Sequence, residues 1–294
     1  MEIINISVII PTFNAEKYIQ NILENIISQD YEVIIIDSGS TDRTLNIVSN
    51  YQCEIIQIKK EEFNHGGTRN KAAMLAQGDI IVFLTQDAIP VESSAIEKLI
   101  EPIIKNEYIG MAYGRQLPHK NAKLMGSFAR IFNYPNKSCV KNIKDVEKLG
   151  IKTVFCSNSF SAYKKSVLEE VGMFPSHVIL SEDTYVAAKM ILAGYSIAYV
   201  AEAMVYHSHD YTILEEFKRY FDIGVFYGRE KWILENFSSA EGEGVKFVKE
   251  QAKFLLKNNA VHLYPELVVR NIAKYIGCQH RLKIPQFQRN EIPH

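Results

Sequence analysis

One stretch constrains the fold of this chain more than any other: the five apolar residues 80–84, which lie between a glycine and a polar cluster that ends in Asp87. A short apolar run bounded in this way is typical of a strand buried on both faces of a mostly parallel sheet. Similar runs occur earlier in the chain and alternate with helical patterns, at residues 6–10, 33–36 and 53–58. This alternation predicts an α/β fold with a mostly parallel, doubly wound sheet flanked by helices.

Asp87 follows the central predicted strand and is therefore expected at its carboxyl end. In open α/β sheets, ligands bind in the crevice outside the carboxyl ends of the strands. A carboxylate in that position can hold a hard cation such as Mg²⁺ or Mn²⁺, which in turn neutralises phosphate oxygens of a ligand. Taken alone, the residue is better explained as a solvated acid in a loop.

The composition is that of a well-cored globular protein of one large or two modest domains, since the 294 residues are 47% hydrophobic and 11% aromatic. A formal net charge of −1 does not favour nucleic acid as a partner. The four cysteines lie far apart without CxxC spacing, which predicts reduced thiols in a cytoplasmic protein. They are Cys53, Cys139, Cys156 and Cys278.

The sequence indicates neither a signal peptide nor a membrane-spanning helix. Residues 1–5 carry no basic region and lead directly into the first predicted strand, unlike a signal peptide. No apolar run approaches the ~20 residues that a membrane-spanning helix needs. Any membrane contact is therefore expected to be peripheral, at the inner face of the cell membrane.

Polar residues between the predicted elements supply further candidates for a site. Gly66 and Gly67 would let the backbone approach a ligand, and Arg69, at the start of a predicted helix, could meet an anion. A plain turn with a solvated arginine explains the same residues. The pair Glu182 and Asp183 precedes another predicted helix, where acids also serve simply to complement the helix dipole.

Two histidines, His207 and His209, follow the last predicted strand. At this spacing they would face the same way on a strand and could supply an imidazole to a metal, although such pairs are more often structural. Residues 118–150 lose regular patterning and are interpreted as a mobile loop over a site or as an ordinary surface excursion.

The carboxyl-terminal third, residues 211–294, is predicted to be helical and is first aromatic and then basic. From residue 241 onward it contains nine Lys and Arg against five Asp and Glu. Four lysines fall on one face of a predicted helix, which could rest on an anionic membrane surface or be the solvated side of a packed helix. They are Lys246, Lys249, Lys253 and Lys257.

Taken together, the motifs resemble the family 2 glycosyltransferases of the GT-A fold, over roughly residues 6–210. Six elements appear in the order typical of that family: residues 7–14, 36–42, 67–70 and 85–88, the pair Glu182-Asp183, and His207. Residues 64–70 and 85–88 are similar to bacterial rhamnosyltransferases that build O-antigen or other cell-surface polysaccharide. The resemblance divides the chain into a nucleotide-sugar transferase domain, residues 1–210, and a helical region, residues 211–294, on the membrane or acceptor side.

The resemblance implies a role for each candidate residue. Asp183, with Glu182 beside it, would be the catalytic base. The metal, Mg²⁺ or Mn²⁺, would be held by Asp87 and His207, with His209 in reserve. Residues expected to bind the nucleotide are Pro11, Thr12, Asn14, Asp37, Ser38, Gly67, Arg69 and Gln86.

One departure from the family pattern affects the expected metal site. Thr85 stands where the DxD motif has its first acid, so this loop would give the metal a single carboxylate. The chemistry implied is an inverting transfer without a covalent intermediate, with L-rhamnose from dTDP-rhamnose passing to a lipid-linked or polysaccharide acceptor. The alternatives are a UDP-hexose donor, or a degenerate nucleotide-binding protein on the same fold.

Overall fold

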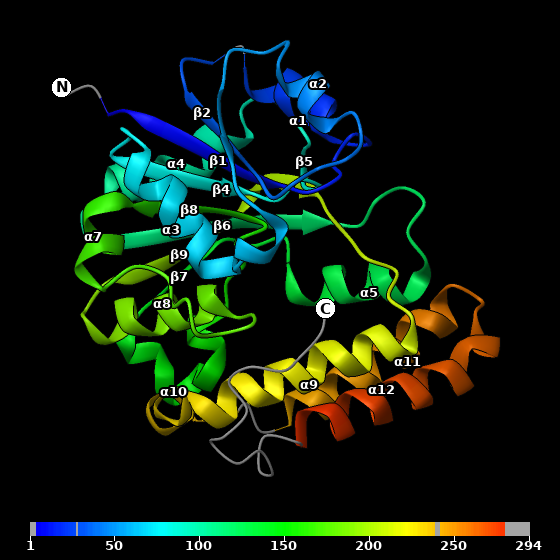
Figure 1. Ribbon diagram of the computed structural model, residues 1–294. Helices are drawn as coiled ribbons and strands as arrows, with labels where there is room; N and C mark the ends of the chain where they lie inside the picture. The colour runs from blue at the N-terminus through cyan, green and yellow to red at the C-terminus, as the bar shows by residue number, and fades with distance from the viewer. Residues whose placement is uncertain (1–3, 28, 239–241, 280–294) are drawn as a thin grey trace.

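A mixed sheet of nine strands forms the centre of the protein (Figure 1). The structure, a computed structural model, describes residues 4–27, 29–238 and 242–279. The strands are β1 (Ile6–Thr12), β2 (Glu32–Asp37), β3 (Glu54–Gln57), β4 (Ile80–Leu84), β5 (Ile89–Pro90), β6 (Ile109–Leu117), β7 (Cys139–Lys141), β8 (Phe160–Lys164) and β9 (Ser196–Tyr206).

The amino-terminal half of the sheet is parallel, as the sequence predicts. Strand β1 pairs in parallel with β2 and β4, and β2 with β3. The other half is mixed, because β8 is inserted antiparallel between β4 and β6, and β9 runs parallel to β6. Strands β5 and β7 are both antiparallel to β9. The helix-flanked α/β prediction is confirmed, but the sheet is less uniformly parallel than expected.

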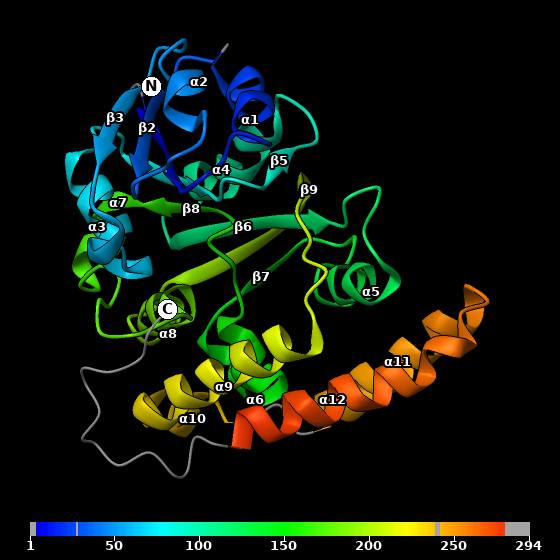
Figure 2. The same ribbon diagram turned by 45° about the vertical axis from the view of Figure 1, so that its right-hand side comes forward.

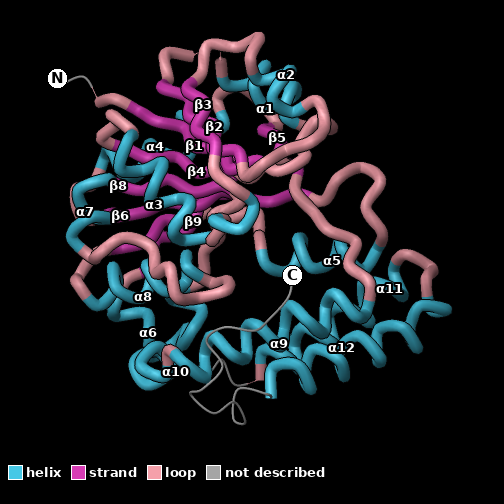
Figure 3. Tube along the Cα trace, viewed as in Figure 1, coloured by secondary structure: helices cyan, strands magenta, loops and turns pink. Residues whose placement is uncertain are grey.

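Both faces of the sheet are covered by helices (Figure 3). The side chains of β4 alternate between two hydrophobic clusters: Ile81 and Phe83 belong to one, and Val82 and Leu84 to the other. The first cluster includes residues of α3 (His65–Leu75), α7 (Lys165–Glu170) and α8 (Glu182–Leu192). The second includes residues of α1 (Ile19–Ile26), α2 (Thr44–Val48) and α4 (Ala95–Lys105). This burial on both faces explains why the β4 sequence is continuously apolar.

The segment 118–150, predicted to be a loop, contains regular structure. It folds into α5 (Leu124–Asn133), β7 and the short helix α6 (Val146–Leu149). In α5, Phe128 is buried and its ring packs against those of Phe132, Phe247 and Phe254. Phe128 and Phe132 lie on one apolar face of α5. Their contacts with Phe247 and Phe254 hold this segment against helix α11 (Glu243–Lys257).

The described part of the carboxyl-terminal third is helical, as predicted. Its helices are α9 (Ile213–Arg229), α10 (Lys231–Phe237), α11 (Glu243–Lys257) and α12 (Tyr264–Gln279). Figures 1 and 2 both show α9 and α12 side by side below the sheet. Close approach is possible because Gly277 of α12 meets the Phe217 carbonyl of α9, and a Cβ there would lie 2.9 Å from that oxygen. No helix in the described ranges is long and apolar enough to cross a membrane.

Candidate active site

A cleft of about 1000 Å³ opens between the sheet and the carboxyl-terminal helices. Its lining includes Asp87 after β4, Asp183 at the start of α8, and His207 and His209 after β9. Residues of α5, α9 and α12 line the opposite side. The two carboxylates on which the sequence-based hypothesis depends therefore share one cavity, although almost a hundred residues separate them in the chain.

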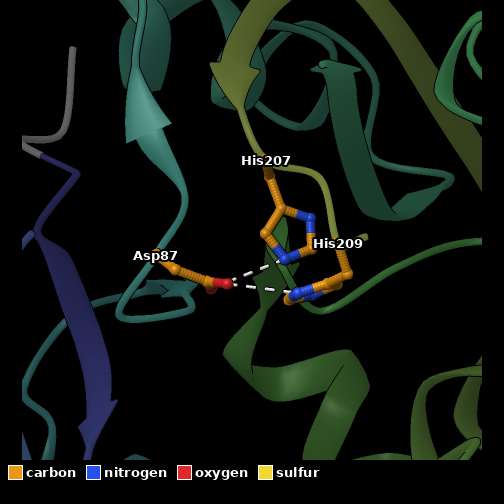
Figure 4. Close-up of side chains that lie close together, drawn as sticks. All are labelled: Asp87, His207 and His209. Atoms are coloured by element: carbon orange, nitrogen blue, oxygen red, sulfur yellow. Dashed lines mark ion pairs between the residues drawn. The ribbon is translucent and has the colours of Figure 1, made fainter. Parts of the chain in front are cut away.

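Asp87, His207 and His209 form a compact cluster in this cleft (Figure 4). Asp87 Oδ1 lies 3.5 Å from His207 Nε2, and Asp87 Oδ2 lies 3.7 Å from His209 Nε2. One ligand atom from each residue lies within 4.8 Å of the others. A carboxylate and two imidazoles gathered around a common point can hold a divalent metal ion.

Hydrogen bonding orients His207 for coordination. Gln116 Nε2 donates to Ser157 Oγ at 3.0 Å, so Gln116 Oε1 is left to accept from His207 Nδ1 at 2.9 Å. The Nε2 lone pair of His207 then points toward Asp87. This is the arrangement in which an outer-shell amide fixes the tautomer of a metal-binding histidine.

Electrostatics favour neutral imidazoles at the cluster. Burial lowers the pKa of His207 well below its usual value, and the charge of Arg130 lowers it further. Burial also lowers the pKa of His209, against the opposing influence of Asp87. Because a metal binds only neutral imidazole, the cluster is ready to bind a cation near neutral pH. The donor set therefore fits the metal that the sequence predicts.

Thr85, at the position of the missing first acid, also lines the cleft. Its backbone N–H donates to the Ser159 carbonyl at 3.1 Å, while its buried hydroxyl has no hydrogen-bond partner among the described residues. The hydroxyl is thus available to a ligand but adds no charge. His209 supplies a further metal ligand in place of the absent carboxylate. It restores the number of ligands but not the negative charge.

Asp183 lies half-buried at the amino terminus of α8 and has a raised pKa. Burial and then the negative charge of Glu182 raise its pKa to about 6. Its Oδ2 accepts from the Asn158 backbone N–H at 3.2 Å, and its Oδ1 accepts from the Thr184 N–H at 2.7 Å. A carboxylate that is held in place and has a pKa near neutrality is suited to accept a proton from an attacking hydroxyl.

Arg69 does not open a helix, contrary to the sequence-based expectation. Helix α3 already begins at His65, because the Asn64 side chain caps it by accepting from the Gly67 N–H at 2.8 Å. Arg69 is therefore inside the helix, buried, and 3.1 Å from the carboxylate of Glu182. Gly67 is likewise part of the first helical turn. Gly66 approaches protein rather than an open site, since a Cβ there would lie 2.1 Å from the Pro175 carbonyl oxygen.

The other predicted nucleotide-binding residues gather at the carboxyl ends of β1, β2 and β4. Asp37 is fully buried and accepts from Thr12 Oγ1 at 2.9 Å and from the Ser40 N–H at 2.9 Å. Gln86 bonds both backbone polar groups of Phe13. These contacts join the three strand ends into one network, but the described lining of the cleft does not include it. The network comprises Pro11, Thr12, Asn14, Asp37, Ser38 and Gln86.

Asn158 and Gln116 are two positioning residues that sequence reasoning missed. Besides its backbone contact with Asp183, Asn158 donates from Nδ2 to Glu182 at 3.1 Å. Its Oδ1 accepts from Tyr163 at 2.6 Å and from Ser161 at 2.9 Å. An Asn in a Ser-rich stretch carries no motif, and only its saturated hydrogen bonding in the fold reveals the role.

The fold and the cleft define a GT-A type transferase. Residues 7–172 match the family model described as Glycosyl transferase family 2, and the chain belongs to this family. It is an inverting glycosyltransferase that uses a nucleotide-sugar donor. The prediction of family and fold from the sequence is thereby confirmed.

Two curated relatives extend the similarity over most of the chain. The O-antigen chain rhamnosyltransferase RfbN of Salmonella typhimurium is 50% identical over 277 residues, which cover 92% of this chain and 88% of the relative. The O-antigen chain rhamnosyltransferase WbaN of Salmonella anatum is 48% identical over 276 residues, covering 92% and 87%.

Solved structures support the fold. The mannosyltransferase PcManGT from Pyrobaculum calidifontis, in complex with GDP-Man and Mn²⁺, aligns with a TM-score of 0.66 at 17% identity, over 96% of this chain and 88% of that one. Staphylococcus aureus TarS 1–349 in complex with UDP-GlcNAc aligns with a TM-score of 0.54 at 17% identity, over 94% and 90%.

Proposed function

We propose that this protein transfers L-rhamnose from dTDP-rhamnose to a lipid-linked or polysaccharide acceptor in the synthesis of O-antigen or a related surface glycan. The choice of sugar is supported by the two rhamnosyltransferases at 50% and 48% identity. The observation that carries the transfer chemistry is the presence of Asp87 and Asp183 in one cleft.

Asp183 is the base in this proposal, and Glu182 beside it maintains its environment. An acceptor hydroxyl has a pKa far above neutrality, so it needs a base within hydrogen-bond reach as it attacks the anomeric carbon. Attack from the face opposite the leaving diphosphate inverts the anomeric configuration. The proton of the hydroxyl passes to a carboxylate oxygen of Asp183.

Asp87, His207 and His209 would hold Mg²⁺ or Mn²⁺. When bound, the metal would stabilise the negative charge that develops on the departing diphosphate. The chain's own part is to present three deprotonated ligands, with Gln116 orienting His207.

The nucleotide would bind at the joined ends of β1, β2 and β4. Pro11, Thr12, Asn14, Asp37, Ser38 and Gln86 form the network there, and Asp37 would contact the base or ribose. Gly67 would belong to the wall of this site through its backbone, and Arg69 would approach the nucleotide from α3 while remaining paired with Glu182. Residues 1–210 would thus form the transferase domain.

The helical region 211–294 would lie on the acceptor side, at the inner face of the cell membrane. Lys246, Lys249, Lys253 and Lys257 are all exposed on α11. Exposed apolar side chains on α12 add a lipid-compatible surface. They include Val268, Ile272 and Tyr275, which are 53%, 53% and 67% exposed. Residues 280–294 of the predicted basic region lie outside the described part of the chain.

A donor panel tests the proposed sugar. The purified protein is incubated with Mn²⁺ and either dTDP-rhamnose, UDP-glucose or UDP-galactose, and release of the nucleoside diphosphate is measured with and without a glycan acceptor. Turnover with dTDP-rhamnose alone supports the proposal. Turnover with a UDP-hexose would assign the chain to a different donor, and no turnover with any donor, together with retained nucleotide binding, would favour a degenerate binding protein.

A further inference from the structure

Two arginines in the cleft differ from the other arginines around them. Arg130 of α5 and Arg219 of α9 both line the cleft but form no ion pair with any described carboxylate. The other two arginines of the lining are paired, Arg69 with Glu182 and Arg270 with Glu216 and Glu266. Of the two lysines, Lys274 pairs with Glu216, and Lys123 forms no ion pair with a described carboxylate.

Arg130 carries a donor that no described residue satisfies. Its Nε is buried and has no hydrogen-bond partner among the described residues. Leaving a buried donor of a charged group unpaired is costly, and proteins rarely retain such a group without a use for it. A ligand with several acceptor oxygens would remove this cost.

Both arginines line the cleft that also holds Asp87, His207 and His209. Arg130 comes from α5 and Arg219 from α9, the helices that face this cluster. Guanidinium groups bind phosphate oxygens in a bidentate manner, which fits a diphosphate better than a single carboxylate.

We propose that Arg130 and Arg219 form a diphosphate-binding site between α5 and α9, next to the metal-binding cluster. This rests on the proposed function only in that the reaction involves a diphosphate. During transfer, the bond from the anomeric carbon to the diphosphate oxygen breaks and its electron pair stays on that oxygen. The acceptor oxygen forms the new bond to carbon, and its proton goes to Asp183.

The leaving diphosphate thus gains one negative charge in the transition state. A pair of positive charges near it would add to the stabilisation that a metal on Asp87, His207 and His209 would supply. Arg219 lies outside residues 7–172, the part that matches the family model. Half of the proposed site is therefore supplied by the carboxyl-terminal helices.

A diphosphate could reach this site from two sources: the nucleotide donor or a lipid diphosphate that carries the acceptor. Calorimetric titrations with inorganic pyrophosphate, dTDP and a short-chain alkyl diphosphate separate them. The titrations use the full chain with and without Mn²⁺, as wild type and as Arg130→Gln and Arg219→Gln. Arg229→Gln is a matched control, since Arg229 is exposed on the same helix α9 and does not line the cleft.

Each cleft variant is expected to bind pyrophosphate about tenfold more weakly or worse, because one charge-assisted contact is lost. Arg229→Gln should bind like wild type. If dTDP shows a matching loss, the site belongs to the donor; if the alkyl diphosphate shows the loss and dTDP does not, the site belongs to the acceptor. Unchanged affinities for all three ligands overturn the proposal.

Further controls separate a loss of binding from a loss of folding, and the result from the identity of the donor sugar. Arg130→Lys keeps the charge and should recover part of the affinity, and all variants are compared with wild type by thermal unfolding. If Arg130→Gln does not fold, Arg219→Gln and Arg130→Lys decide the outcome. Because pyrophosphate contains no sugar or base, a wrong assignment of rhamnose would leave this result intact.

Discussion

The guanidinium of Arg69 lies 3.1 Å from the carboxylate of Glu182, and the two side chains are only 6% and 7% exposed. This ion pair joins α3 to α8 in the interior, next to the predicted base. Burial opposes ionisation of Glu182, but the charge of Arg69, helped by the hydrogen bond from Asn158, outweighs it, and the pKa of Glu182 falls below its usual value. Glu182 therefore stays negative and raises the pKa of neighbouring Asp183.

Breaking this pair should destabilise the fold strongly. Arg69→Met leaves the Glu182 carboxylate buried without its partner, a change that typically costs about 3–5 kcal/mol. The double variant Arg69→Met/Glu182→Gln should recover part of that loss. Urea unfolding measures both, with Arg43→Met as the control, because Arg43 pairs with Glu16 at the exposed surface. A loss for Arg69→Met no larger than the ~0–1 kcal/mol expected of a surface pair would contradict this interpretation.

Adjacent glycines at the start of α3 should respond in opposite ways to alanine. A Cβ at Gly66 would lie 2.1 Å from the Pro175 carbonyl oxygen, whereas the nearest atom to one at Gly67 is 3.4 Å away. Gly66→Ala should therefore destabilise by about 1–3 kcal/mol or more through overpacking. Gly67→Ala should be near neutral or gain up to ~1 kcal/mol from helix propensity. If Gly66→Ala and Gly67→Ala have equal midpoints in thermal unfolding, α3 does not approach Pro175 as closely as described.

The sequence predicted the parallel half of the sheet well because a strand buried on both faces leaves a continuous apolar run. It did not predict that β8 is antiparallel, since a buried strand looks alike in either direction. Helix α5 was missed because Gly126 and scattered polar residues interrupt its pattern. Yet Gly126 has a structural reason: a Cβ there would lie 2.6 Å from the Asp210 carboxylate.

The sequence predicted most residues of the site but few of the contacts between them. Asp87, His207 and His209 followed from a strand end and a family resemblance, and the structure brings them together. The partner of Arg69 could not be predicted, because a contact between helices distant in sequence leaves no local pattern. The early start of α3 could have been inferred from Asn64, a strong helix-capping residue, but two glycines argued against a helix there.

Metal binding should depend on Asp87 and, more weakly, on Gln116. Asp87→Asn removes the only carboxylate of the cluster and should largely abolish Mn²⁺-dependent binding of a nucleoside diphosphate. Gln116→Leu removes the acceptor that orients His207 and should weaken Mn²⁺ about 10–100-fold. Calorimetry with Mn²⁺, repeated after chelation, measures both effects, and the exposed Asp30→Asn is the control. Wild-type Mn²⁺ affinity in Asp87→Asn would place the metal elsewhere.

Membrane contact through α11 should depend on its lysines. Replacing Lys246, Lys249, Lys253 and Lys257 by Gln should reduce sedimentation with anionic liposomes, since each lysine near such a surface contributes about 1 kcal/mol. A control variant with the same change in charge replaces four lysines exposed elsewhere: Lys59, Lys71, Lys105 and Lys148. If both variants sediment alike, the face of α11 is merely solvated.

The role assigned to Asp183 has a defined dependence on pH. The base must be deprotonated to accept the hydroxyl proton, and burial with the charge of Glu182 raises its pKa to about 6. The transfer rate should therefore be constant above this pH and fall about tenfold per unit below it. Nucleotide binding should not follow the same curve, because Asp183 does not bind the nucleotide in this mechanism.

The rate of sugar transfer by Asp183→Asn at saturating donor tests the central claim most directly. The amide keeps the shape of the side chain but cannot accept the proton, so the rate should fall at least about 10²–10⁴-fold. Affinity for the nucleoside diphosphate, measured on the same preparation, should stay within about twofold of wild type. Near-wild-type turnover by Asp183→Asn would contradict the account and place the base at another residue.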